Sequence, residues 1–134
     1  MDRDVVDRDI VGRTGTAESI VTDQDTALAL GSGDVPVLGT PRLIAWVEEA
    51  TCRALEGAVA PNETTVGTVV DIAHRRPSNV GDRVMTYAQV VAVEGARVTF
   101  EVHADHRTPE GQLVESIARG RIVRAIVDRG DFGG

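Results

Sequence analysis

The sequence predicts an α+β protein in which one long helix packs against an antiparallel sheet. Apolar residues recur at helical spacing over one long segment, about residues 41–56, and alternate with polar residues through the segments that follow. Short turns join those later segments, which favours antiparallel neighbours. A single sheet curled around a central helix is the compact way to bury the apolar face of that helix.

Length and composition limit the function classes. The chain has 134 residues and a net charge of −7, and all 14 of its basic residues are arginine. The absence of lysine excludes a Schiff-base, pyridoxal-phosphate or P-loop lysine. The acidic balance argues against nucleic-acid binding. The single cysteine, Cys52, permits no internal disulfide and no cysteine-based zinc site.

No apolar run approaches the roughly 20 residues of a membrane span, and the first residues do not resemble a signal peptide. We therefore expect a cytoplasmic protein without a membrane partner. Residues 1–13 alternate Asp, Arg and Val and are expected to be a tail or an extra strand, and residues 14–132 a single domain.

The elements follow in order along that domain. Residues 14–22 are expected to form a strand. Asp23 is a candidate N-cap for a short helix over residues 24–30, and residues 31–34 are expected to end that helix. Thr40 is the expected N-cap of the long helix, with Pro41 at its first position.

Four strands are expected after Asn62. The first carries Val66, Thr68, Val70, Ile72 and His74 on one face, and the others cover about 83–94, 98–104 and 113–127. The chain has only four aromatic residues, so its core must rest on aliphatic side chains. A dimer that joins two sheets would help to close that core.

Glu48 and Glu49 are adjacent but lie on different sides of the predicted helix. Glu49 aligns with Arg53 on a polar flank, whereas Glu48 lies at the edge of the apolar stripe that faces the sheet. Partial desolvation there suits Glu48 to proton transfer or attack. The alternative is a boundary residue with its carboxylate in water.

His74 is either a boundary residue or a site residue directed at the helix. His103 and His106 are expected on or after the solvent-facing register of their strand, and three scattered histidines make a weak case for a metal. We expect neither a metal nor a cofactor.

Thr40 stands at the helix start, where backbone N–H groups and the helix dipole can stabilise an oxyanion. Because Pro41 has no backbone N–H, we expect a second backbone N–H donor for the oxyanion. Gly67 on the facing strand is the candidate, since a glycine permits close approach of the backbone. Arg75, Arg76 and Arg124 could contact phosphate or form a solvated rim.

Several runs together resemble a known family. They are Gly39–Ala50 (GTPRLIAWVEEA), Glu63–Thr68 (ETTVGT), Asp71–Pro77 (DIAHRRP), Val80–Asp82 (VGD) and Arg124–Asp128 (RAIVD). Over residues 14–132 the chain resembles the hotdog-fold thioesterases of the fluoroacetyl-CoA thioesterase-like family.

The resemblance implies a hotdog fold, a homodimer or tetramer, and an active site at the dimer interface that hydrolyses an acyl-CoA thioester. It places the catalytic residues at Thr40, Glu48 and His74. It also places the strand glycine at Gly67 and the late arginine at Arg124. Gly39, Arg75 and Arg76 are the further candidates for substrate contact.

Two departures from the family pattern are visible. The segment from Gly31 to Leu38 contains no aromatic residue, whereas the fluoroacetyl-specific member has phenylalanines there, so we do not expect fluoroacetyl selectivity. The run Gly120–Arg124 (GRIVR) also differs from the family's Gly-Thr-His-Glu-Arg. The alternative function is a non-catalytic dimer that binds acyl-CoA or a small ligand. A hydratase is disfavoured because Asp34 has no histidine close to it in sequence.

Overall fold

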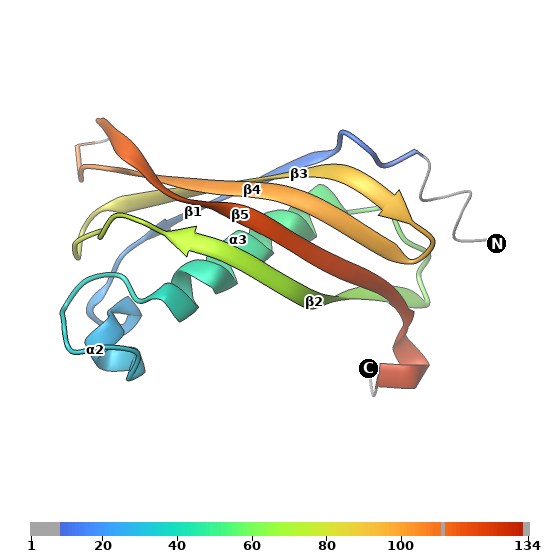
Figure 1. Ribbon diagram of the computed structural model, residues 1–134, viewed down its shortest axis with the longest axis horizontal. Helices are drawn as coiled ribbons and strands as arrows, with labels where there is room; N and C mark the ends of the chain where they lie inside the picture. Colours follow the sequence, from blue (N-terminus) through green and yellow to red (C-terminus); the bar gives the residue numbers. More distant parts are fainter. Residues whose placement is uncertain (1–8, 111, 133–134) are drawn as a thin grey trace.

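The computed structural model describes residues 9–110 and 112–132, which build one five-stranded antiparallel sheet curved around a helix (Figure 1). The expected α+β order is confirmed. The elements are β1 (Thr14–Ile20), the 3₁₀ turn η1 (Asp23–Asp25), α2 (Ala27–Leu30), α3 (Thr40–Ala54), β2 (Glu63–His74), β3 (Arg83–Glu94), β4 (Arg97–Arg107), β5 (Leu113–Asp128) and η2 (Arg129–Phe132). Most of the segment 1–13 expected as a tail or extra strand, residues 1–8, lies outside the described residues.

The strands are ordered β1-β3-β4-β5-β2, so that β1 and β2 form the two edges of the sheet. Every second residue is buried from Val84 to Val90 in β3 and from Val98 to His106 in β4, which confirms the alternation expected from the sequence. The core is aliphatic apart from Phe100. His106 is also buried on this face, so the expectation that it faces solvent is wrong.

The helix α3 begins one residue earlier than expected. Gly39 is its N-cap, with extended backbone angles, and Thr40 is its first helical residue. A Cβ at position 39 would approach the backbone of Ala27 to 3.1 Å, so contact with α2 favours glycine as the cap. The capping role expected of Thr40 is therefore wrong, and its hydroxyl is available for another partner.

The segment before α3 folds into a small lobe at one end of the sheet (Figure 1). Thr26, not Asp23, caps α2, since its hydroxyl accepts from the Ala29 N–H. Leu38 and Val37 make β-bridges to Thr26 and Asn79, which tie the lobe to the chain beyond β2. None of the described helices is long and apolar enough to cross a bilayer, and the expected cytoplasmic location stays a prediction.

A bulge in β2 changes which side chains face α3. The pairing with β5 shifts between Gly67 and Val69, which leaves Thr68 as the extra residue. Gly67 and His74 are seven positions apart and would face opposite sides of a regular strand. With the bulge, both pair with inward-facing residues of β5, whereas Val66 moves to the outer face. The expectation that Val66 shares a face with His74 is therefore wrong.

Candidate active site

Thr40 and His74 meet where α3 begins and β2 ends. The Thr40 hydroxyl lies 2.8 Å from Nδ1 of His74, although the residues are 34 positions apart. The hydroxyl can donate to Nδ1 because Gly39, and not Thr40, caps the helix. A hydroxyl bonded to an imidazole is the arrangement that activates a nucleophile or orients a water molecule.

The surroundings of His74 favour its neutral form. Burial lowers the pKa of His74 below its ordinary value of 6.5, and a backbone contact with Arg76 opposes this only in part. A neutral imidazole can accept a proton at neutral pH. The second ring nitrogen, Nε2, is buried without a hydrogen-bond partner in the described part of the chain. It is therefore the ring atom left for a substrate or a second subunit.

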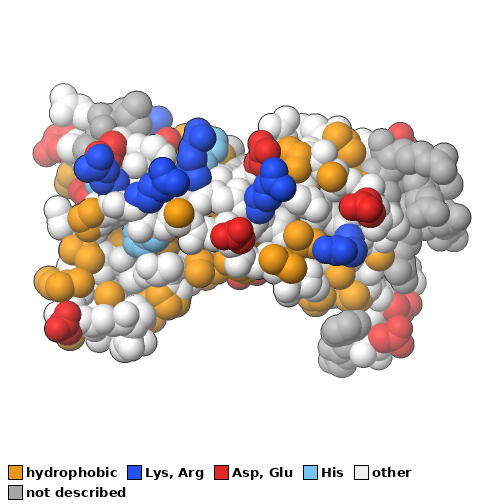
Figure 2. Space-filling view, in the orientation of Figure 1, with side chains coloured by type: hydrophobic (Ala, Val, Ile, Leu, Met, Phe, Trp, Pro, Cys, Tyr) orange, Lys and Arg blue, Asp and Glu red, His pale blue; other side chains and the backbone are white. Residues whose placement is uncertain are grey.

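Thr40 and His74 line a cleft of about 310 Å³ between β2 and the lobe. Its walls combine small and aliphatic residues with the backbone and side chains of the segment after β2, and the lining includes Ala27, Val35, Val37, Leu38, Arg75, Arg76 and Pro77. Figure 2 shows basic side chains gathered at the end of the molecule where β2 stops. Arg75 and Arg76 are exposed and line this cleft, where an anionic group of a ligand could contact them, and Arg76 also lies 3.5 Å from the Glu115 carboxylate.

Glu48 is partly buried on the side of α3 that faces the sheet, and its carboxylate lies 3.5 Å from the Arg124 guanidinium. Glu49 instead forms an exposed pair with Arg53 at 2.8 Å. The predicted difference between the two glutamates is therefore confirmed.

Gly67 and Arg124 surround the Glu48 carboxylate. A Cβ at position 67 would lie 2.5 Å from Oε2 of Glu48, so the absence of a side chain makes room for the carboxylate. Arg124 is only 7% exposed, and it also donates to the hydroxyl and carbonyl oxygens of Thr65. The expectation that Arg124 lies on a phosphate-binding rim is wrong, because its guanidinium is turned inward onto Glu48.

Thr65 was not among the residues selected from the sequence. It lies two residues before Gly67 on the same face of β2 and holds the Arg124 guanidinium through its side chain and its backbone. Its position on the face of Gly67 was a signal that could have identified it.

The backbone N–H of Gly39 has a partner within the chain, and the substrate contact expected of this residue stays a prediction. Its N–H donates to the carbonyl oxygen of Asp25 at 2.9 Å, and Pro41 has no N–H. Of the first three backbone groups at this helix start, the Thr40 N–H is the one left to face a substrate oxygen.

The candidate residues form two groups within one chain. Thr40 and Glu48 are eight residues apart on α3, which separates them by about 12 Å along the helix axis. Each has its own partner, His74 for Thr40 and Arg124 for Glu48. The structure therefore brings Thr40 and His74 together but does not bring Glu48 to them within a single subunit.

Comparisons with known proteins identify similar chains. The sequence profile described as fluoroacetyl-CoA-specific thioesterase matches residues 21–130. A crystal structure of the fluoroacetyl-CoA thioesterase FlK is 26% identical, with a TM-score of 0.80 and coverage of 92% of this chain and 91% of that one. In another FlK structure, that of a mutant, fluoroacetate and CoA are bound. No curated protein matches the chain.

Two further structures show the same architecture. A thioesterase superfamily member from Thermus thermophilus is 26% identical, with a TM-score of 0.79 and coverage of 92% of this chain and 87% of that one. A hot-dog-like protein from Thermanaerovibrio acidaminovorans is 22% identical, with a TM-score of 0.81 and coverage of 99% and 93%. The sheet and its central helix thus form a hotdog-like fold.

Proposed function

The chain belongs to the family of fluoroacetyl-CoA-specific thioesterases, and on that basis we propose that it hydrolyses an acyl-CoA thioester to a carboxylate and free CoA. Thioester hydrolysis is the activity that the family and the similar structures have in common. The observation that carries the proposal for this chain is the hydrogen bond between Thr40 and His74 in a cleft with two exposed arginines.

In the proposed reaction, His74 accepts the proton of the attacking oxygen. That oxygen belongs either to the Thr40 hydroxyl, giving a transient ester that water then cleaves, or to a water molecule that Thr40 orients. The C–S bond breaks, and CoA leaves as a thiol after taking a proton from His74. Glu48 orients the imidazole, acts as base on water, or attacks directly. In that last route the CoA thiolate leaves as a mixed anhydride forms. Water then cleaves the anhydride, which restores Glu48, releases the carboxylate and supplies the proton that the thiolate takes up. Arg75 and Arg76 contact the phosphates of CoA.

We further propose that two chains build each site. The outer edge of β2 pairs with no other described strand, and Val69 and Val70 are 47% and 42% exposed on it. An open strand edge of this kind is a template for pairing with a second chain. Two β2 strands paired antiparallel about a two-fold axis near Asp71 would form one continuous sheet.

This pairing would also complete the site. Gly67 and His74 pair with Arg124 and Ala118 of β5, and Asp71 pairs with Arg121, midway between those two residues. An axis at Asp71 would therefore set His74 opposite Gly67 of the partner subunit. Glu48 of the partner subunit lies beside that glycine and would meet the free Nε2 of His74. We propose a homodimer for this reason, and a tetramer would need a further contact elsewhere.

The acyl pocket supports a substrate other than fluoroacetyl-CoA. The cleft beside Thr40 is lined on the lobe side by Ala27, Val35, Val37 and Leu38, and residues 31–38 contain no aromatic side chain. We propose an aliphatic acyl group, because these walls offer apolar contact without a ring.

The proposal is tested with purified protein and a panel of acyl-CoA thioesters, with release of free thiol as the readout. We expect turnover of at least one aliphatic acyl-CoA and no preference for fluoroacetyl-CoA over acetyl-CoA. Saturable binding of acyl-CoA without any thiol release would instead support a binding dimer.

A further inference from the structure

A second cavity lies on the outer face of the sheet, the face turned away from α3. It measures about 750 Å³, which is larger than the active-site cleft and within the usual range for small-molecule sites. Thr40, Glu48 and His74 do not contribute to its lining. The proposed hydrolysis therefore leaves this cavity without a role.

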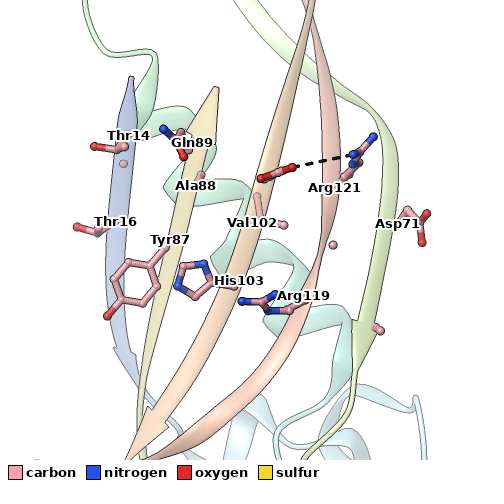
Figure 3. Close-up of a pocket in the computed structure, with 14 residues that line it drawn as sticks. Thr14, Thr16, Asp71, Tyr87, Ala88, Gln89, Val102, His103, Arg119 and Arg121 are labelled. Atoms are coloured by element: carbon pink, nitrogen blue, oxygen red, sulfur yellow. Dashed lines mark ion pairs between the residues drawn. The ribbon is translucent and has the colours of Figure 1, made fainter. Parts of the chain in front are cut away.

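Two rows of side chains cross the five strands and form the floor of this outer cavity (Figure 3). The strand register aligns one row as Thr16, Tyr87, His103, Arg119 and Ala73. It aligns the second as Thr14, Gln89, Glu101, Arg121 and Asp71. Cross-strand neighbours on one face interact directly, so each row acts as a unit.

The two rows differ in charge. In the second row, Arg121 lies 3.9 Å from Glu101 and is also paired in register with Asp71, so its charge is compensated. The first row contains no acidic residue. Arg119 makes no ion pair with any described residue, and its neighbours in the row are His103 and Ala73. Arg119 is therefore the cation on this floor that is left for an anionic ligand.

The first row also carries two aromatic rings beside that cation. The rings of Tyr87 and His103 are stacked, with centroids 4.5 Å apart and an interplanar angle of 11°. Burial lowers the pKa of His103, and Arg119 acts in the same direction while Asp105, two residues along β4, opposes both. A neutral His103 adds no second charge to the row, and Figure 3 shows Arg119 next to it.

We propose that the outer cavity binds a small organic anion with a planar ring. The ring packs against Tyr87 and His103, and its carboxylate or phosphate group contacts Arg119. Aromatic contact and a charge-assisted hydrogen bond are the two interactions that this row offers together. The site is distinct from the one that hydrolyses the thioester.

The test is calorimetric titration of the full chain with phenyl phosphate and with benzoate. We expect saturable binding of one or both. Uncharged benzamide should bind at least about tenfold more weakly than the charged probe, because it lacks the anionic group. The charged probe should bind Arg119→Gln at least about tenfold more weakly than the original protein, because the variant lacks the cation. Tyr87→Leu should weaken binding through loss of the ring contact. Thiol release from acyl-CoA should be unchanged in Arg119→Gln.

Arg121→Gln is the matched control, because it removes an exposed arginine from the same face of the same strand. It should leave the affinity within about threefold of the original. The proposal is overturned if neither probe shows saturable binding at concentrations up to about 10 mM, tenfold above a Kd of 1 mM. It is equally overturned if Arg121→Gln weakens binding as much as Arg119→Gln does.

Discussion

In each of the two candidate groups, a neighbouring glycine determines where the candidate side chain lies. Thr40 is free to contact His74 because Gly39 caps α3. Glu48 reaches the sheet because position 67 has no side chain. At both places a glycine beside the candidate residue makes its position possible.

Removing either acid–base group should abolish most of the activity. We expect Glu48→Gln and His74→Ala each to lower kcat by roughly 10²–10⁴-fold, the usual contribution of proton transfer. Glu49→Gln is the control, since Glu49 pairs with Arg53 at the surface and should be nearly silent. The rate of thiol release is measured for the three variants. A large loss of kcat in Glu49→Gln would show that Glu49, and not Glu48, is the functional glutamate.

The pH dependence should report His74. Burial lowers the pKa of His74 in the single chain, whereas the carboxylate of the partner's Glu48, proposed beside Nε2, would raise it. The acidic limb of kcat/KM should therefore have its midpoint at a lower pH in Glu48→Gln than in the original protein. Activity should be constant above that limb and fall as the imidazole is protonated. A profile of kcat/KM from pH 5 to 8 for both proteins measures this, and equal midpoints would contradict a carboxylate beside the imidazole.

At the scale of elements, the bulge in β2 determines which of its residues face α3 at the candidate site. One extra residue at Thr68 turns both Gly67 and His74 toward α3, although their spacing in a regular strand would separate them. The Glu48 carboxylate therefore packs against the middle of β2, at Gly67, and the His74 side chain lies at the end of the same strand.

A methyl group at position 67 should disturb this arrangement locally. In Gly67→Ala the new Cβ would meet Oε2 of Glu48, which must move away from its place beside Arg124. Because the end of a flexible side chain yields, we expect the Tm to change little and kcat to fall. Thermal unfolding and thiol release measured on the same sample test this, and an unchanged kcat would show that the position of Glu48 is not critical.

The same elements show what the sequence could predict. Period-two alternation located β3 and β4, because each buries one face, and helical periodicity located α3 and distinguished Glu48 from Glu49. The bulge was not predicted, although a glycine inside a strand, here Gly67, can mark one. The sequence pattern alone does not identify Thr68 as the extra residue. The N-cap was misplaced by one residue because glycine and threonine both suit it, and contact with α2 decides between them. The burial of Arg124 follows from pairing with Glu48, 76 positions away.

At the scale of the whole molecule, the outer edge of β2 pairs with no other described strand of the chain. If two β2 strands pair there, a charge in the middle of that edge should weaken the pairing. We expect Val70→Lys to shift the protein toward monomer in analytical ultracentrifugation and to reduce activity with it. Val91→Lys, at an exposed valine of β3, is the control and should leave the sedimentation unchanged.

The central claim is that His74 of one chain works with Glu48 of the partner subunit, and mixed dimers test it most directly. Glu48→Gln and His74→Ala chains, each nearly inactive alone, are unfolded together, refolded at equal amounts and assayed for thiol release. A shared site predicts recovery of about a quarter of the original activity, since half of the randomly formed dimers carry one intact site of two. No recovery in a preparation shown to contain mixed dimers would contradict the account.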